Sequence, residues 1–305
     1  MNSRFAHPTP RAATAFTVVE LMVAVSVLSL IVVVLYNIFD NTQRAMRSNA
    51  AQVDVMEGGR AAAELIARDL EQMTGLGLAG ATNFYAHSLG LPFAQSLPGP
   101  TNDLNRRINF QQELFFTSRF NKQGSGIGYR VVPTNGVVGS LYRYAEDVPN
   151  AFLTSNLLSS NFFRFANTNA LATDHLRGFQ RVTDGVVHFR VTAFDSLGQP
   201  IDPRYYPTNR ATNRRYPEDW YYPDVFMMCR SHDAPPSYAF TNFAVPASVE
   251  IELGILEPYI LDRYRSMTNN RTVASNYLAR QAARVQVFQQ RIPVRSAPSL
   301  LPVFP

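Results

Sequence analysis

One carboxylate stands at the start of a long apolar run, and this is the pattern in the chain most able to do chemistry. Glu20 precedes nineteen residues, 21–39, without a formally charged side chain. A carboxylate in hydrocarbon costs at least about 2.5 kcal/mol without a partner, so an acid at this place predicts a functional contact. A cut between Ala15 and Phe16 would free the α-amino group of Phe16, four residues before Glu20. That cation is the partner we expect for the carboxylate, within one chain or between neighbouring subunits.

The run 21–39 is long enough to cross a membrane as a helix. Nineteen residues extend about 28 Å at ~1.5 Å per residue, close to the ~30 Å hydrocarbon core of a bilayer. The segment 1–15 carries Arg4 and Arg11, no acid and no apolar stretch, so it does not resemble an ordinary secretory signal. Its positive charge favours a cytoplasmic N-terminus, with the rest of the chain across the membrane.

The residues around the expected cut resemble a known processing signature. Ala-Phe-Thr-Val-Val-Glu-Leu-Met-Val-Ala, residues 15–24, is similar to the site found in type IV prepilins and type II secretion pseudopilins. The resemblance implies cleavage by a prepilin peptidase between Ala15 and Phe16, N-methylation of Phe16, and a subunit-contacting role for Glu20 during assembly. The family usually has glycine before the cut, and alanine is small enough for the same protease subsite.

A second resemblance covers residues 183–257 loosely. A strand ending in a DSLG turn, a Trp-bearing loop and then VPASVEIELGILEP look similar to the C-terminal half of the minor pseudopilin J family. The long loop 199–224 and the segment 259–290 depart from that pattern. The two resemblances imply a pilin-like α+β fold, in which a long, half-transmembrane N-terminal helix packs on a mainly antiparallel β-sheet.

The helical pattern continues beyond the apolar run. Residues 40–73 lack proline and are rich in good helix formers. They carry an apolar stripe at mostly three- or four-residue steps: Met46, Val53, Met56, Ala63, Ile66, Leu70 and Met73. We expect this stripe to pack on the chain's own globular domain, with a partner helix as the alternative. Two adjacent glycines, Gly58 and Gly59, predict a bend or local loosening.

The rest of the chain predicts a β-rich domain with long connections. Strand patterns cover 113–117, 128–132, 140–144, 185–194, 225–229 and 247–256. We expect a long loop with short ordered pieces at 74–110, loops with one short helix at 145–178, and an irregular aromatic loop at 199–224. The pattern favours helix around 274–290, with a closing strand at VQVFQQRIPV as the alternative.

Alternation along two of these strands predicts which side chains face the core. The apolar set of the strand 185–194 is Val187, Phe189, Val191 and Ala193. In the strand 247–256, Val249, Ile251 and Leu253 alternate with Glu250, Glu252 and Gly254. The second pattern is typical of a half-buried edge or outer strand.

Charge and cysteine content exclude several functions. The formal charge of +5, or +3 without Arg4 and Arg11, is spread along the chain, and Lys122 is the only lysine. No basic run interleaved with aromatics supports nucleic-acid binding. Cys229 is the only cysteine, so no intramolecular disulfide can form, and its apolar neighbours indicate a small core residue.

No residue set predicts catalysis, a metal or a cofactor. The histidines, expected on the surface, are scattered: His7, His87, His175, His188 and His232. Two glycine-rich stretches, 75–80 and 124–128, lack the Lys-Ser/Thr of a phosphate loop and are interpreted as loops. Three aspartates considered for calcium, Asp195, Asp202 and Asp224, have no consecutive ligand spacing. We therefore expect a protein that is not an enzyme.

The expected organisation is a leader at 1–15, a transmembrane and assembly helix at 16–39, the soluble half of the helix at 40–73, and a periplasmic pseudopilin domain at 74–305. The expected function is that of a minor pseudopilin in a type II secretion-type filament. The alternatives are a type IV pilus minor pilin for adhesion or DNA uptake, and a membrane-anchored binding protein that does not assemble.

The expected location is the bacterial inner membrane, spanned once, with the C-terminal domain in the periplasm. The partners implied by the resemblance are a prepilin peptidase, other pilins or pseudopilins, the inner-membrane assembly platform and membrane lipid.

Overall fold

The computed structural model describes residues 17–88, 92–97, 106–121, 123–133, 137–166, 178–202, 224–228, 235–267 and 270–295. The chain divides into two compact units, Met1–Ala50 and Ala51–Pro305. Helix α1 (Val18–Glu71) begins in the first unit and ends in the second. The second unit is built on an antiparallel β-sheet, so the expected α+β class is confirmed.

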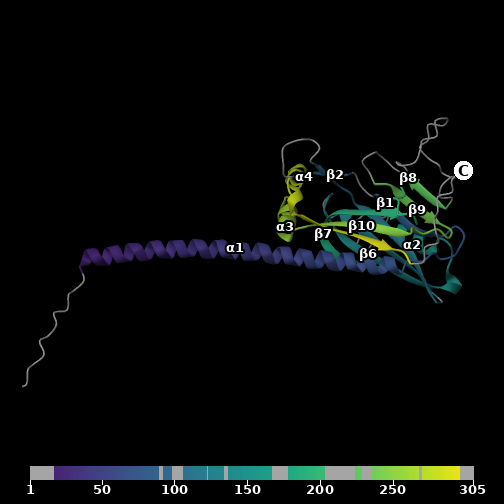
Figure 1. The fold of residues 1–305 in the computed structure, drawn as a ribbon, viewed down its shortest axis with the longest axis horizontal. Coiled ribbons are helices and arrows are strands. Elements are labelled where there is room, and N and C mark those ends of the chain that lie inside the picture. Colours follow the sequence, from purple (N-terminus) through teal and green to yellow (C-terminus); the bar gives the residue numbers. More distant parts are fainter. Residues whose placement is uncertain are drawn as a thin grey trace, which may run out of the picture. The chain divides into compact units, whose positions relative to one another are not determined.

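The described strands of the second unit form one nine-stranded antiparallel sheet and a small two-stranded sheet (Figure 1). In the large sheet the order is β11-β10-β7-β6-β5-β4-β1-β9-β8. Its strands are β1 (Thr82–Ser88), β4 (Gln112–Phe120), β5 (Gln123–Pro133), β6 (Gly139–Pro149), β7 (Phe179–Phe194), β8 (Val225–Met228), β9 (Ser237–Thr241), β10 (Ser248–Leu256) and β11 (Val285–Pro293). The small sheet pairs β2 (Phe93–Ser96) with β3 (Arg106–Asn109).

Three short helices complete the second unit. Helix α2 (Leu157–Ala166) follows β6 and a 3-10 turn at Asn150–Phe152, which confirms the short helix expected in that region. Helices α3 (Pro258–Ser266) and α4 (Arg271–Ala279) lie in the chain between β10 and β11, before a second 3-10 turn at Ala282–Arg284. Pro258 opens α3, and the Asn270 side chain caps α4 by accepting from the amide of Val273.

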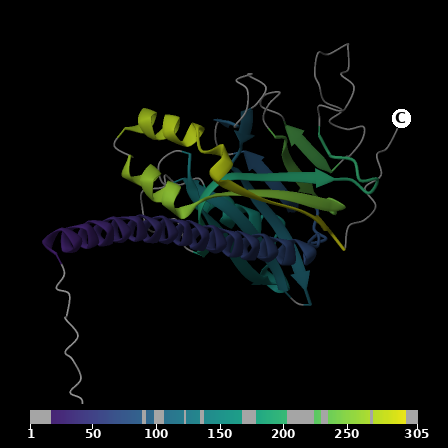
Figure 2. The ribbon, with the colours of Figure 1, turned by 60° about the vertical axis from the view of Figure 1, so that its left-hand side comes forward.

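The last turns of α1 pack across one face of the large sheet (Figure 2). The buried helix residues that join this core are Val55, Ala62, Ala63, Ile66, Ala67, Leu70, with Met73 just beyond the helix. The expected stripe is correct only in its second half. Met46 and Val53 are 68% and 53% exposed, and Met56 is also exposed. The buried face lies about a quarter to a third of a turn away, where small residues allow the helix to approach the sheet.

Gly59 marks the closest approach of α1 to the sheet. An added Cβ would lie 2.1 Å from the Phe288 ring of β11, whereas at Gly58 nothing lies within 4 Å. The helix is continuous through both glycines, so the expected loosening is wrong. Glycine at position 59 lets an aromatic ring of the sheet rest on the helix backbone.

A buried polar cluster fixes the end of α1 to the same face. The hydroxyl of Tyr129 donates to Asp69 at 2.5 Å, and Arg143 Nε donates to the same carboxylate oxygen at 2.6 Å. The Asp69 charge and the low-polarity surroundings raise the pKa of the Tyr129 hydroxyl well above its ordinary value, with burial the larger cause. Tyr129 therefore remains a donor, and the three side chains connect α1 to β5 and β6.

Helix α2 and Leu153, which precedes it, cover the opposite face of the sheet by packing on a line of glycines. Gly124, Gly126 and Gly128 alternate along β5, and added Cβ atoms would lie 2.8, 3.1 and 2.4 Å from Leu153, Leu158 and Phe162 respectively. The stretch 124–128, expected as a loop, is therefore strand, and the loop interpretation is wrong. Its glycines serve close helix-to-sheet packing rather than a turn.

The other strand predictions hold in outline, with informative exceptions. Each of the six expected strands overlaps an observed strand over its described residues. The short ordered pieces expected within 74–110 are β1, β2 and β3, and β1 lies inside the large sheet between β4 and β9. The helix expected at 274–290 ends at Ala279, and the closing-strand alternative is confirmed as β11.

The observed pairing of β10 and β7 corrects two further expectations about these strands. Strand β10 has β7 on one side and β11 on the other, so it is half-buried but is not an edge strand. A register shift opposite Gly254 and Ile255 places Val186 in the core under α1, and Val187 in the second core beneath α3 and α4. The bulge thus exchanges the faces of these two valines, while Phe189, Val191 and Ala193 face the α1 core as expected.

Candidate functional site

The expected processing site is described only in part. Ala15 and Phe16 lie outside the described residues, and so do Cys229, Lys122, the histidines at 7, 175 and 232, and most of the aromatic loop 199–224. Glu20 is described, in the first turn of α1, and its side chain is exposed. The described contacts of the Glu20 side chain are with Thr17.

Thr17 and Glu20 form a capping box at the start of α1. The Thr17 hydroxyl accepts from the Glu20 amide at 3.3 Å, and Oε2 of Glu20 accepts from the Thr17 amide at 3.4 Å. The Thr17 hydroxyl also lies 3.4 Å from the same carboxylate oxygen. The box satisfies amides that no helical carbonyl can reach, and it places a negative charge at the positive end of the helix dipole.

This contact is a role for Glu20 that the resemblance did not supply. The signal was present in the sequence, because Thr followed three residues later by Glu before an apolar run is a helix-start signature. Glu20 can be satisfied without a second chain, through Thr17. A contact with the amine of Phe16 falls outside the described residues and stays a prediction.

The helix that follows is suited to a hydrocarbon environment. Among the described residues, α1 is the one helix long and apolar enough to cross a membrane. The two serine hydroxyls inside the apolar run are satisfied within the helix, because Ser26 and Ser29 each donate at 2.8 Å to the carbonyl four residues before. Neither serine therefore presents an unpaired hydroxyl to the surroundings of the helix.

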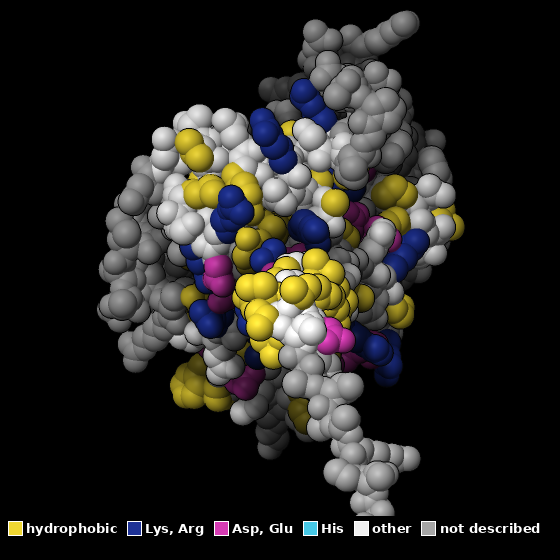
Figure 3. Space-filling view, turned by 90° about the vertical axis from the view of Figure 1, so that its left-hand side faces the viewer, with side chains coloured by type: hydrophobic (Ala, Val, Ile, Leu, Met, Phe, Trp, Pro, Cys, Tyr) yellow, Lys and Arg dark blue, Asp and Glu magenta, His cyan; other side chains and the backbone are white. Residues whose placement is uncertain are grey.

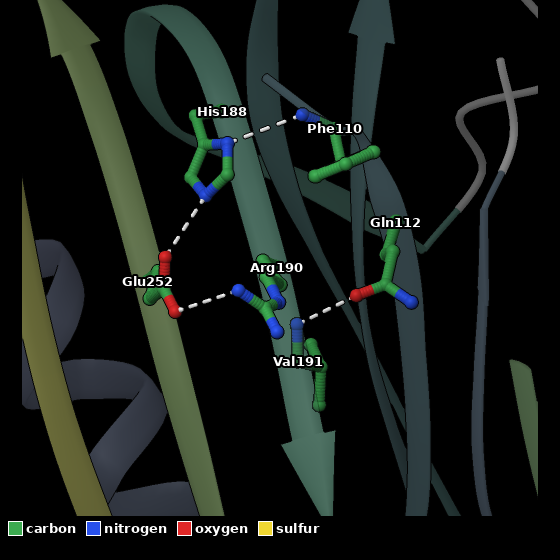
Figure 4. A network of polar contacts seen from close by, with 6 residues as sticks. All are labelled: Phe110, Gln112, His188, Arg190, Val191 and Glu252. Atoms are coloured by element: carbon green, nitrogen blue, oxygen red, sulfur yellow. Dashed lines mark hydrogen bonds and ion pairs between the residues drawn. The ribbon is translucent and has the colours of Figure 1, made fainter. Parts of the chain in front are cut away.

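The second unit contains a buried polar cluster that sequence reasoning did not assemble (Figure 4). His188 of β7 is 4% exposed, which corrects the expectation of a surface histidine. Its Nδ1 accepts from the Phe110 amide at 3.1 Å, so Nε2 carries the proton that faces Glu252 Oε2 at 3.3 Å. The hydrogen-bond partners thus fix one tautomer of this imidazole.

Glu252 is the anion at the centre of the cluster. Arg190 Nη1 lies 3.4 Å from its second oxygen, and Arg107 adds a further positive charge from β3. The hydrogen bond from His188, together with the charges of Arg190 and Arg107, holds the pKa of Glu252 below its ordinary value against the opposing effect of burial. Burial lowers the pKa of Arg107, and the Glu252 charge opposes that effect.

Neighbouring contacts indicate that this cluster fastens strands together. Gln112 of β4 accepts from the Val191 amide at 2.7 Å and donates to the Pro236 carbonyl at 3.1 Å. A Cβ on Gly254 would lie 2.9 Å from Arg107 Nη2, so glycine lets this guanidinium approach β10. The carboxylate and imidazole groups are occupied by each other, and the arrangement connects β3, β4, β7 and β10.

Two of the aspartates considered for calcium, Asp195 and Asp224, form hydrogen bonds at separate places in the chain. Asp195 Oδ1 accepts from the amides of Leu197 and Gln199 at 2.9 and 2.8 Å, which closes the turn after β7. Asp224 accepts from the Asn242 side chain beside β9. In the described ranges no three histidine, cysteine or acidic side chains gather in a way that could hold a metal ion.

Comparison of the chain with protein-family models, with curated proteins and with solved structures finds no match. The class that the described residues define is an α+β protein with an N-terminal helix apolar enough to span a membrane.

Proposed function

We propose that this chain is a minor pseudopilin, a structural subunit that primes or caps a type II secretion-type periplasmic filament. The observation that carries the proposal is the placement of Glu20 in the first turn of a 54-residue helix that begins two residues after Phe16. The antiparallel sheet behind the helix supports a pilin-like arrangement.

The mechanism is mechanical. Cleavage between Ala15 and Phe16 by a prepilin peptidase leaves a methylated amine one residue before the helix cap at Thr17. A positive charge there opposes the helix dipole, so it needs a carboxylate nearby. In a filament, residues 16–39 pack among neighbouring helices, and Glu20 reaches the Phe16 amine of the next subunit. That contact sets the axial register.

The proposed setting is the inner membrane, with the domain from residue 74 onward in the periplasm. The proposed partners are the peptidase, other major and minor pseudopilins, and the inner-membrane assembly platform. The apolar side chains of α1 from Val18 to Phe39 are exposed in the isolated chain. Lipid before assembly and neighbouring helices after assembly would cover them.

Three substitutions separate a charge contact from the capping role of Glu20. Glu20→Gln keeps an oxygen that can accept from the Thr17 amide but removes the charge, Glu20→Ala removes both, and Thr17→Ala removes the cap alone. We expect both Glu20 variants to insert in the membrane yet fail to enter filaments, and Thr17→Ala to enter them. The measurement is the fraction of each variant in sheared filaments, relative to its amount in membranes.

The capping box also favours a second candidate, a membrane-anchored binding protein that never assembles. In that case the carboxylate is already satisfied by Thr17, and no neighbouring chain is required. This candidate predicts an uncleaved leader and normal function for Glu20→Gln. Wild-type-like incorporation of Glu20→Gln into filaments would contradict the register role and leave capping as the function of this residue.

A further inference from the structure

Arginine side chains gather at one end of the second unit, around α3 and α4 (Figure 3). The segment 257–284 carries five arginines and two acids, which gives it a net charge of +3 out of +5 for the whole chain. The sequence expectation that charge is evenly spread is therefore wrong in the fold. The described arginines of this arginine-rich end are Arg106, Arg181, Arg263, Arg265, Arg280 and Arg284.

Contacts bring these arginines together from distant parts of the chain. Asp184 lies 3.3 Å from Arg181 and 3.6 Å from Arg265, so one carboxylate serves two guanidinium groups. Gln95 of β2 donates to the Leu278 carbonyl of α4 at 3.0 Å, which places the β2–β3 pair with Arg106 beside the helices. Folding thus brings Arg106 and Arg181 next to the arginines of the α3–α4 region.

The carboxylates at this end do not neutralise it. Arg284 lies 3.5 Å from Glu257, at the limit of an ion pair, and more than half of its side chain is exposed. Arg280 is exposed, and no ion pair joins it to a described residue. Exposed ion pairs contribute little and leave most of the field of the cations in the solvent.

Apolar side chains lie exposed among these cations. Tyr259 at the start of α3 is 65% exposed, and Val273 in α4 is 49% exposed. The guanidinium of Arg263 lies over the Tyr277 ring, 5.5 Å from its centroid. Arginine, tyrosine and an aliphatic side chain on short helices are the residue types found at membrane–water interfaces.

This end is also the one through which α1 enters the second unit. Helices α3 and α4 connect the end of β10 to the start of β11. Phe288, three residues into β11, lies against Gly59, near the beginning of the part of α1 that belongs to this unit. The arginine-rich end therefore lies on the side of the unit nearest Ala51.

The connection between this end and the apolar run is short. Eleven residues, 40–50, separate Phe39 from the second unit, or about 16 Å if helical. Headgroups extend about 6 Å beyond the hydrocarbon, and an exposed charge acts over a screening length of about 8 Å at physiological salt. This short segment tethers the second unit close to the surface of any bilayer that holds the apolar run.

We propose that the arginine-rich end docks on the anionic headgroups of the membrane in which α1 is anchored. The inference rests on the membrane anchoring in the proposed function, though not on filament assembly. Docking holds the second unit against the bilayer. The ligand is a lipid phosphate surface carrying net negative charge, because scattered, solvated arginines match a field of headgroups better than a single compact anion.

The experiment uses the full chain in nanodiscs, with Cys229→Ser and a single fluorescent label at Thr272→Cys on α4. Energy transfer to a headgroup-labelled lipid is compared between phosphatidylcholine alone and phosphatidylcholine mixed with phosphatidylglycerol, at about 0.15 M salt. We expect transfer from position 272 to increase about twofold with the anionic lipid, and to return to the neutral-lipid value at about 1 M salt.

Two matched double variants test which charges act. Arg280→Gln with Arg284→Gln removes exposed arginines from the proposed surface and should remove at least half of the increase. Arg164→Gln with Arg295→Gln removes two exposed arginines elsewhere on the unit, one in α2 and one that pairs with Glu71. This double variant should leave the increase in energy transfer intact. A label at Phe152→Cys, beyond the opposite end of β6, should show no increase.

The docking proposal is overturned by equal energy transfer in the two lipid mixtures from a chain that co-purifies with the nanodiscs. It is also overturned by equal loss in the two double variants, since that would reflect net charge alone. Processing and incorporation of Glu20 variants are read separately. A chain that docks on anionic lipid but stays unprocessed would contradict the filament proposal and leave the docking proposal standing.

Discussion

At the residue scale, two adjacent glycines of α1 have opposite surroundings. Gly58 is exposed with nothing within 4 Å of an added Cβ, while at Gly59 the same atom would meet the Phe288 ring. We expect Gly58→Ala to stabilise the folded chain by about 0.5–1 kcal/mol, because alanine costs less backbone entropy in a helix. We expect Gly59→Ala to destabilise it by about 1–3 kcal/mol through overpacking.

Urea unfolding of the full chain in mild detergent, followed by near-ultraviolet circular dichroism, measures both changes. The two substitutions add the same methyl group to the same helix, so each is the control for the other. Equal stabilisation by both would show that Phe288 does not rest on the helix backbone in solution.

Two glutamates, the half-buried Glu252 and the buried Glu113, have pKa values displaced in opposite directions. Contacts with His188 and the arginines lower the pKa of Glu252, whereas burial raises the pKa of Glu113 against the weaker effect of Arg130. Oε2 of Glu113 is buried without a hydrogen bond in the described structure. The first carboxylate therefore adds stability when ionised, and the second reduces it.

The signs give opposite expectations for two isosteric substitutions. At about pH 7 we expect Glu252→Gln to lower the free energy of unfolding by about 1–2 kcal/mol and Glu113→Gln to raise it by about 1 kcal/mol. Because the pKa of Glu252 is lower in the folded chain, its ionised carboxylate stabilises the fold at pH values above the ordinary pKa of 4.5. That stabilisation is lost as the pH falls through the lower pKa of the folded chain. A raised pKa costs stability once pH rises above 4.5.

Both differences should therefore shrink as the pH is lowered to about 3. Unfolding by urea at the two pH values checks the expectation, with Glu250→Gln on the same strand as the control. Changes of the same sign in the two variants would contradict the assigned environments.

What the sequence could predict at this scale depends on separation along the chain. The contact of Thr17 with Glu20 is local and has a sequence signature, although the expected partner of Glu20 was the Phe16 amine. The contact of His188 with Glu252 joins residues 64 apart. Alternation places both on polar faces of their strands, but only the pairing of β7 with β10 brings them together.

At the element scale, β11 forms one edge of the large sheet, and its backbone has two unlike sides. The carbonyl of Arg284 accepts from the Glu257 amide, and the Val294 amide donates to the carbonyl of Ala247. In the antiparallel register, the even-numbered residues of β11 between these two therefore form backbone hydrogen bonds with β10. Odd-numbered residues, Gln289 among them, direct their amides away from the sheet. Pro293 stands at an odd position, where a missing amide costs no ladder bond.

This parity predicts the effect of proline at two adjacent positions. Gln290→Pro removes an amide that bonds to Ile251 and should destabilise the chain by about 3 kcal/mol. Gln289→Pro removes an outward amide and should cost clearly less. Thermal unfolding of the two variants in detergent provides the measurement. An equal loss at both positions would contradict the register of β11.

The elements also show where pattern reading fails. Strand β1 was missed because TNFYAHS is short and mixed in polarity, and a strand in the interior of a sheet depends on neighbours that the local sequence does not specify. The glycines of β5 were interpreted as a loop because an isolated glycine pattern does not reveal a helix resting on it. The strand 185–194 was recognised, since its apolar alternation is strong.

At the scale of the whole molecule, the sequence specifies an apolar helix and a β-rich domain well, and the distribution of charge poorly. The helix was recognisable because nineteen mostly apolar residues without a formal charge are typical of a helix that spans a membrane. The excess of arginine in 257–284 is present in the sequence, but the addition of Arg106 from β3 and Arg181 from β7 follows only from the fold. The distribution of charge over the surface depends on which strands and helices are neighbours, and local sequence patterns do not specify this.

The central claim is that the chain is processed before Phe16 and then assembles through its N-terminal helix. Its most direct test is the intact mass and N-terminal sequence of the protein from membranes of cells with and without prepilin peptidase. We expect a mature chain that begins at methylated Phe16 only when the peptidase is present. A chain that retains Met1 in both strains would contradict the account and favour a membrane-anchored binding protein.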